Sequence, residues 1–144
     1  MASRRFEASL QTHGERLGPD RGQSHRCPGN AILGGLVKPW EIWTWNFPEA
    51  GDHPAVILGT DDRVKHKPRI SVLLCSSKQA AREPEAHEIV LDEADGLNWA
   101  TLCKCDLVYG VLKTELTRRR GLVIVERRRG IAERVIRGLG FAGL

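Results

Sequence analysis

Ala100-Thr-Leu-Cys-Lys-Cys-Asp-Leu-Val-Tyr109 is the stretch around which the rest of the chain is organised. It reads as a β-strand, along which side chains alternate between the two faces of a sheet. Lys104 and Asp106 are therefore expected on one face, with Cys103 and Cys105 on the other. That face presents a carboxylate beside a cation. Such a pair is most often a weak surface ion pair. Whether it is instead part of a functional site must be judged from the neighbouring motifs.

Four further stretches predict strands. Within the first, Trp43, Trp45 and Phe47 share one face by alternation. At least two of these aromatic residues are expected in the core, although exposed aromatic rings also form stacking platforms for RNA. Continuous apolar runs predict most of the other strands. The predicted ranges are 38–47, 55–60, 69–75 and 87–91.

The connecting segments predict turns and loops, and the end of the chain predicts a helix. Pro48–Pro54 is expected to form a turn, and the polar segment Asp61–Pro68 a loop that contains His66. Apolar residues at helical spacing predict one amphipathic helix from Val125 to Leu139 that ends at Gly138 and Gly140. The expected architecture is mainly β (α+β): a small closed or half-open barrel of five to six strands with a C-terminal helix packed across it.

Composition narrows the class of protein. A chain of 144 residues fits one domain with a real core. It has no apolar run long enough to span a membrane and no apolar secretory signal, so a cytoplasmic location is expected. The cysteines are Cys27, Cys75, Cys103 and Cys105, which show no usual zinc or disulfide spacing, so free thiols are expected. Between Leu112 and Arg137 there are nine Lys or Arg and three Glu, which suggests a polyanion or an acidic protein as partner.

Residues 1–36 differ from the remainder of the sequence. They are rich in Arg, Ser, Gly and Gln and poor in large apolar residues, which predicts a flexible tail. Order is expected to begin at Val37, so that residues 37–144 form the folded domain. Because bacteria can initiate translation at a valine codon, we also expect the tail to be dispensable or to lie upstream of the true start.

Several short motifs occur in a recognisable order. They are Trp40-Glu-Ile-Trp43, His53-Pro-Ala-Val-Ile-Leu58, Leu73-Leu-Cys-Ser-Ser77, Gly96-Leu97 and Lys104-Cys-Asp106, followed by the closing helix. From Lys38 to the C-terminus the chain resembles the MazF/PemK family of toxin ribonucleases. The resemblance implies an SH3-like barrel that forms a homodimer and binds an acidic antitoxin. It also implies cleavage of single-stranded RNA without a metal or other cofactor.

The resemblance also assigns roles to individual residues. Metal-free RNA cleavage needs a base for the 2′-hydroxyl proton, an acid for the leaving 5′-oxygen, and cations around the phosphate. Asp106 is the expected base and Lys104 the phosphate-stabilising cation. Ser76 and Ser77 are expected to donate hydrogen bonds to the phosphate. His53 stands where many members have an arginine, and a histidine there is a candidate acid.

Further RNA contacts are expected from Lys78, Trp45 and His66, in addition to Ser77. Two other classes of protein are compatible with the sequence. One is an SH3-like barrel that binds nucleic acid or a protein without catalysis, because a fold does not determine a function. The other is a zinc-binding regulator built on Cys75, Cys103 and Cys105, for which strand alternation supplies no clear tetrahedral set.

Overall fold

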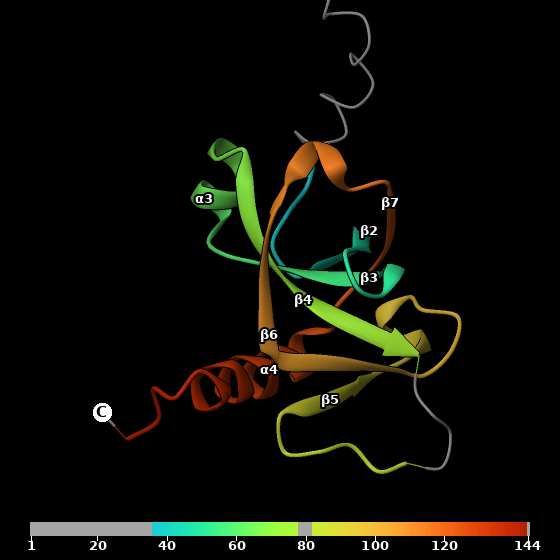
Figure 1. The fold of residues 1–144 in the computed structure, drawn as a ribbon, viewed down its shortest axis with the longest axis vertical. Helices are drawn as coiled ribbons and strands as arrows, with labels where there is room; N and C mark the ends of the chain where they lie inside the picture. Colours follow the sequence, from blue (N-terminus) through green and yellow to red (C-terminus); the bar gives the residue numbers. More distant parts are fainter. Residues whose placement is uncertain (1–35, 78–81, 144) are drawn as a thin grey trace, which may run out of the picture. The chain divides into compact units, whose positions relative to one another are not determined.

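The computed structural model describes residues 36–77 and 82–143 (Figure 1). Its strands pair antiparallel in one six-stranded sheet of order β5-β6-β4-β3-β2-β7. The strands are β2 (Glu41–Phe47), β3 (Gly51–Leu58), β4 (Arg69–Ser77), β5 (Glu88–Leu91), β6 (Thr101–Leu112) and β7 (Arg118–Leu122). The helices are α3 (Asp61–His66) and α4 (Val125–Gly138), with 3-10 turns η2 (Glu93–Asp95) and η3 (Lys113–Glu115). The sheet curls into a half-barrel, so the predicted architecture is confirmed.

Two apolar clusters hold this sheet together. The first includes Trp43 and Phe47, and the half-buried Trp45 packs against it, as the alternation along β2 predicts. The second cluster includes Cys103 and Cys105 of β6 and the fully buried Ile131 of α4. It therefore fastens the helix to the sheet. Figure 1 shows α4 beside β5 and β6, at the end of the domain opposite α3.

β6 is long and bends in its middle. It pairs with β4 in two parts, Arg69–Leu73 with Val108–Leu112 and Cys75–Ser77 with Thr101–Cys103, with a register shift between them. The four residues from 104 to 107 lie in the irregular part between the two ladders. Irregularities of this kind re-aim side chains and are frequent next to active sites. Through this part of β6 the predicted alternation is confirmed: Cys103 and Cys105 are buried, whereas Lys104 and Asp106 lie on the other face and are partly exposed.

Three local expectations were wrong. His53 lies in β3, paired with Trp45, and not in a turn. The segment 61–66 forms the helix α3, because Thr60 caps its first turn and Asp61 and Asp62 face the positive end of the helix.

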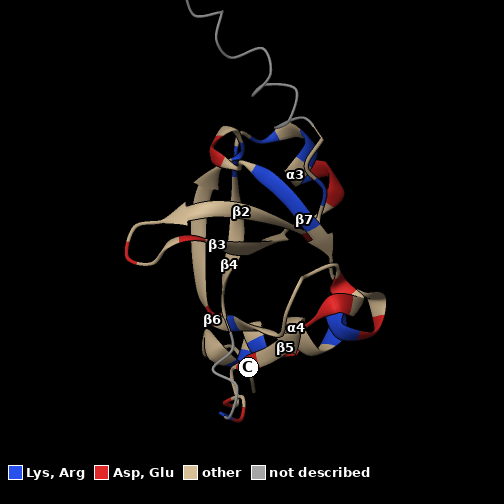
Figure 2. Ribbon diagram, turned by 90° about the vertical axis from the view of Figure 1, so that its right-hand side faces the viewer, with Lys and Arg blue, Asp and Glu red and all other residues tan. Residues whose placement is uncertain are grey.

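The third concerns β7, which was not among the predicted strands because Arg118-Arg-Arg-Gly-Leu122 lacks an apolar alternation. It lies at the edge of the sheet, where charged side chains are usual. Figure 2 shows the basic residues along it. The helix α4 occurs as predicted, but Val125 and Ile136 of its apolar stripe are exposed.

Some expectations concern residues that the structure does not describe. The predicted tail, residues 1–36, lies outside the described part except for Leu36, and so does Lys78. Val37, the expected first residue of the folded domain, is buried in the first cluster. Within 36–77 and 82–143, no helix is long and apolar enough to cross a membrane.

Candidate active site

Asp106 is the carboxylate at the bend of β6, and α4 packs directly against it. Its side chain is 36% exposed, yet the oxygen Oδ1 is buried and forms no hydrogen bond within the described residues. A methyl group on Gly138 of α4 would lie 3.0 Å from Cβ of Asp106, which shows how closely the helix backbone approaches. A buried carboxylate oxygen without a hydrogen bond is costly for stability. Such an atom is a candidate for function.

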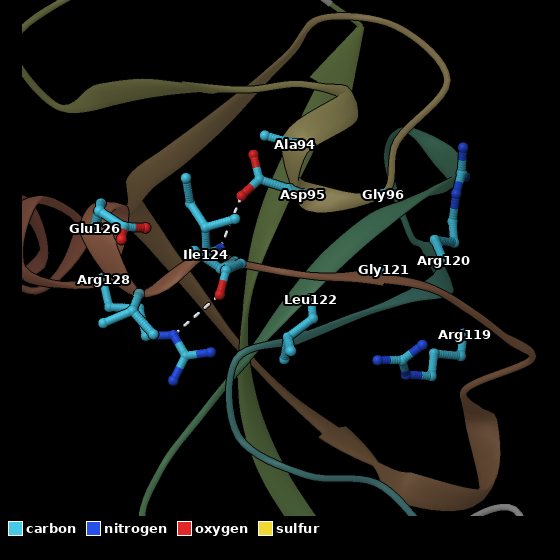
Figure 3. Close-up of a pocket in the computed structure, with 12 residues that line it drawn as sticks. Ala94, Asp95, Gly96, Arg119, Arg120, Gly121, Leu122, Ile124, Glu126 and Arg128 are labelled. Atoms are coloured by element: carbon cyan, nitrogen blue, oxygen red, sulfur yellow. Dashed lines mark hydrogen bonds between the residues drawn. The ribbon is translucent and has the colours of Figure 1, made fainter.

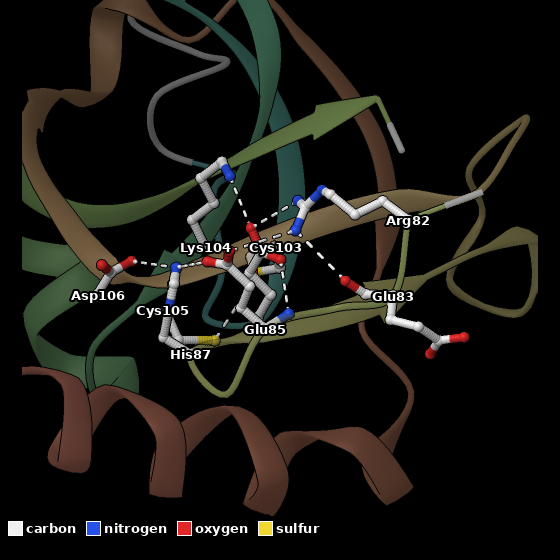
Figure 4. Close-up of polar contacts among 9 residues, drawn as sticks. Arg82, Glu83, Glu85, His87, Cys103, Lys104, Cys105 and Asp106 are labelled. Carbon is white, nitrogen blue, oxygen red and sulfur yellow. Dashed lines mark hydrogen bonds and ion pairs between the residues drawn. The ribbon is translucent and has the colours of Figure 1, made fainter. Parts of the chain in front are cut away.

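His87 is the nearest titratable neighbour of that oxygen. Its Nε2 lies 3.7 Å from Oδ1 of Asp106 and 3.5 Å from Oε1 of Glu85, so the ring stands between two carboxylates (Figure 4). The backbone fixes this position, because the His87 carbonyl accepts a hydrogen bond of 2.9 Å from the Cys105 amide. The ring is about one-third exposed and remains accessible to solvent.

Lys104 forms an ion pair with Glu88 on the neighbouring strand. Its Nζ lies 2.8 Å from Oε2 of Glu88, and Nη2 of Arg82 lies 3.0 Å from the same oxygen. Burial would raise the pKa of Glu88, but hydrogen bonds from Arg82, the Glu85 amide and Lys104 lower it to about 2. The side chain of Glu88 is only 1% exposed, so this ion pair is part of the interior. The ammonium of Lys104 therefore orders β5 against β6.

Two arginines of α4 line a small cavity together with His87, and Nη1 of Arg134 donates a hydrogen bond of 3.1 Å to the Gly130 carbonyl of the same helix. The cavity has a volume of about 170 Å³ and is lined by Ala86, His87, Arg134, Arg137 and Gly138. Nε of Arg134 is buried and forms no hydrogen bond within the described residues. Asp106 and Arg134 thus supply two of the three buried unpaired side-chain polar atoms in the described part of the chain, the third being Oγ1 of Thr44. Arg134 lines the cavity, and Asp106 contacts two other residues that line it, His87 and Gly138, so we take this region as the candidate site.

The predicted site residues are only partly assembled around this cavity. Ser76 and Ser77 end β4 opposite Leu102 and Thr101, the part of β6 that leads into Lys104. They lie on the strand next to the bend, and Ser77 is exposed.

The aromatic and histidine candidates lie elsewhere. Trp45 donates a hydrogen bond of 3.1 Å to Glu115 and packs on Phe47 and Tyr109. In the described part of the chain, no hydrogen bond or ion pair joins His53 to Asp106 or Lys104. His66 is in α3, at the end of the domain opposite α4, where it lies 3.6 Å from the exposed Asp62.

A larger groove lies at the start of α4. Its volume is about 610 Å³, and η2, β7 and the first turn of α4 line it (Figure 3). Asp95 is buried beside it and accepts hydrogen bonds from the Ile124 amide and from Arg127. These hydrogen bonds pair the carboxylate of Asp95 and hold the start of α4 in place. We therefore assign Asp95 a structural role and not a catalytic one.

Within residues 36–77 and 82–143, potential metal ligands occur in two places. Glu85, His87 and Glu88 have ligand atoms within 4.8 Å of one another, but Arg82 and Lys104 already pair with Glu88. The second place is the group of buried free thiols formed by Cys75, Cys103 and Cys105. A hydrogen bond with Cys103, together with burial, raises the pKa of the Cys105 thiol, which favours the protonated form over a metal-binding thiolate.

A curled antiparallel sheet closed by a terminal helix, which packs against the bend of the longest strand, defines a small SH3-like barrel. Solved MazF toxins have this same fold. The Mycobacterium tuberculosis toxin MazF-mt6 is 19% identical, with 68% of this chain and 94% of that chain covered and a TM-score of 0.60. No family model matches the sequence, and a search of curated proteins finds no match.

Two further structures show the same likeness. An endoribonuclease from a mycobacterial species, solved in complex with its cognate antitoxin, is 16% identical, with 75% and 99% of the chains covered and a TM-score of 0.64. A MazE-MazF structure from Deinococcus radiodurans is 13% identical, with 74% and 99% covered and a TM-score of 0.60. At these identities the likeness establishes the fold, and the function must be argued from the site.

Sequence reasoning missed His87, Arg134 and Arg137. His87 begins a predicted strand, and a single histidine carries no motif. The two arginines lie in a basic helix whose charges look like an ordinary solvated face. One signal was available: Gly138 interrupts the end of a predicted helix, and glycine in a helix often permits a close approach by a neighbouring backbone.

Proposed function

We propose that this chain is the toxin of a type II toxin–antitoxin module and acts in the cytoplasm as an endoribonuclease. In this proposal it cleaves single-stranded RNA at preferred sequences and needs no metal. The observation that carries the proposal is the carboxylate of Asp106, held at the bend of a MazF-type sheet in contact with His87 and Gly138, which line a cavity together with two arginines. The endoribonuclease and toxin named among the similar structures support the same reaction.

Asp106 acts as the base. Its buried Oδ1 faces His87, which leaves Oδ2 to accept the proton of an RNA 2′-hydroxyl. The resulting oxyanion attacks the adjacent phosphorus. A base positioned in this way contributes roughly 100-fold to 10,000-fold to a rate.

Cations stabilise the negative charge that develops on the phosphate. We assign this role to Arg134 and Arg137, which line the cavity. Lys104 is held in an ion pair by the buried Glu88, whereas Arg134 donates only to a backbone carbonyl of its own helix, that of Gly130. Arginine suits the role, since its planar guanidinium forms two parallel hydrogen bonds to phosphate oxygens. Ser76 and Ser77 are placed to contact neighbouring phosphates along the strand that leads to the bend. Lys78 is a further proposed RNA contact. Trp45 and His66 lie away from the cavity, so contacts from them would require RNA that extends beyond the cleaved phosphate.

Partners follow from charge and from the similar structures. The basic residues of β7 and α4 favour an acidic antitoxin, and two of the similar structures contain an antitoxin or MazE. Exposed apolar residues of β7 and α4, including Leu122 and Ile136, favour a homodimer.

The test is primer extension on a mixed RNA pool after incubation with antitoxin-free protein in the presence of a chelator. We expect discrete cleavage sites for the wild type and none for Asp106→Asn. The variant Asp62→Asn is the matched control, because Asp62 also faces a histidine but lies in α3, exposed to solvent. Intact RNA that the wild type nevertheless binds would identify the chain as a binding protein without catalysis.

A further inference from the structure

We propose that His87 is a second catalytic residue, which protonates the leaving 5′-oxygen and then recovers a proton from Asp106. This inference rests on the proposed endoribonuclease function and adds the acid that the reaction requires. The inference is based on two observations. His87 lines the cavity with Arg134 and Arg137. Its Nε2 also faces Oδ1 of Asp106 (Figure 4).

The distances suit a base and an acid that serve the same phosphate. His87 and Asp106 are 3.7 Å apart at their nearest ring nitrogen and carboxylate oxygen. In the proposed complex the phosphodiester places its 2′-oxygen near the free oxygen of Asp106 and its 5′-oxygen near His87, each within the roughly 2.6 to 3.2 Å that proton transfer needs.

Charged residues of both signs lie around His87. The carboxylates of Glu85 and Asp106, from the segment before β5 and from β6, are near its ring nitrogen, and Arg134 and Arg137 of α4 line the same cavity. The carboxylates lie 3.5 Å and 3.7 Å from the ring nitrogen, within ion-pair distance. A phosphate bound in the cavity would neutralise the arginines.

The other candidate acids are less suitable. His53 is paired with Trp45 in β3, and no contact in the described residues connects it to Asp106. The ammonium of Lys104 is bound to the buried Glu88. Ammonium groups of lysine also have an ordinary pKa of about 10, so they are weak acids at neutral pH, whereas histidine changes charge there.

Asp106 and His87 together account for every proton that moves in the proposed reaction. Asp106 takes the 2′-hydroxyl proton, the 2′-oxygen forms a bond to phosphorus, and the bond from phosphorus to the 5′-oxygen breaks. His87 gives its proton to that oxygen, so the products are a 2′,3′-cyclic phosphate and a free 5′-hydroxyl. Asp106 is then protonated and His87 neutral. Proton transfer across their contact restores the starting state without any other reactant.

The experiment separates the acid from the base by changing the leaving group. After primer extension has mapped a cleavage site, the same oligonucleotide is made with sulfur in place of the bridging 5′-oxygen. A thiolate leaves without protonation, so its release needs no acid. The proteins compared are the wild type, His87→Gln, Asp106→Asn and the control His66→Gln, whose histidine has the same kind of carboxylate contact at 3.6 Å in α3.

We expect His87→Gln to cut the ordinary RNA roughly 100-fold to 10,000-fold more slowly than the wild type, and the sulfur-containing RNA at nearly the wild-type rate. Asp106→Asn should be slow on both, and His66→Gln normal on both. The wild-type rate on ordinary RNA should fall as the pH rises above neutrality, and this fall should be absent with the sulfur-containing RNA.

Two results would overturn the role of His87 alone. One is wild-type cleavage of ordinary RNA by His87→Gln, and the other is an equal reduction in rate by this variant on both substrates, which would indicate a structural role. If the wild-type protein cuts neither substrate, the proposed function fails as well.

Discussion

Gly138 of α4 lies so close to Asp106 of β6 that a methyl group on the glycine would stand 3.0 Å from Cβ and 3.2 Å from Cα of the aspartate. The last turn of α4 therefore forms one wall of the candidate site. It covers Asp106, whose Oδ1 is buried, and brings Arg134 and Arg137 to the cavity beside His87. The helix thus joins the sheet that carries the carboxylate to the cations that would bind its substrate.

The substitution Gly138→Ala tests this contact. The methyl group must push α4 away from β6 by a few tenths of an ångström. We expect cleavage to fall at least roughly tenfold, because a misplacement of about 1 Å can reduce a rate by about 100-fold. Thermal stability should change little, since alanine favours a helix over glycine by up to about 1 kcal/mol. Rates and melting temperatures are measured together, with the exposed Arg129→Ala as the control. Normal cleavage by Gly138→Ala would show that the contact is irrelevant to activity.

Glu88 predicts how stability depends on pH. Its pKa is lowered in the folded protein to about 2 from an ordinary value of 4.5. The stabilisation is therefore fully present above pH 4.5 and is lost as the pH falls toward 2. A shift of this size corresponds to stabilisation on the order of 3 kcal/mol. Urea unfolding of the wild type and Glu88→Gln between pH 7 and pH 3 should show stabilities that converge in acid. A difference in unfolding free energy between the two proteins that stays constant across this pH range would contradict the lowered pKa of Glu88.

The variant Gly121→Ala should prevent stable folding. A methyl group there would lie 2.0 Å from the backbone carbonyl oxygen of Asp95, which cannot move without disturbing η2. Overpacking against backbone predicts a destabilisation of roughly 3 kcal/mol or more. The control is Gly110→Ala in β6, where the methyl group meets only the side chain of Arg69 at 3.8 Å. The two are compared by chemical denaturation, and equal stability would refute the argument.

The arginines of β7 predict a salt-dependent interaction with RNA. Arg118 and Arg120 line a cavity of about 280 Å³, whereas Arg119 forms an ion pair of 3.0 Å with the buried Glu41. Reversing Arg119 would therefore destabilise the fold, and the informative variant is Arg118→Glu with Arg120→Glu. We expect weaker binding of RNA, with the slope of log affinity against log salt shallower by about 0.7 for each phosphate that the variant no longer neutralises.

This prediction is measured by fluorescence anisotropy at several salt concentrations, with RNA made uncleavable by a 2′-deoxy substitution. The control Arg129→Glu changes an exposed arginine on α4 that pairs with Glu133. Binding of an acidic antitoxin is measured with the same proteins. If neither affinity changes, the arginines of β7 are ordinary solvated side chains.

The local sequence pattern was sufficient to predict most of the strands and the helix α4, but it did not predict α3 or β7. Alternation placed Trp43 and Phe47 in the core, and helical spacing located α4. The helix α3 was missed although its capping threonine and acidic first turn were visible in the sequence. The edge strand β7 was missed because only backbone pairing with β2 makes a strand of three consecutive arginines.

The barrel class, the helix that closes it and the carboxylate at the centre of the candidate site could all be predicted from the sequence, because they follow from periodicities of two and 3.6 residues and from a short motif. The groups that surround Asp106 could not. Lys104, two residues away, pairs with Glu88, while His87 and Arg134 come from other elements. Contacts across a bent strand depend on register and on the close approach of Gly138, and neither is encoded by spacing along the chain.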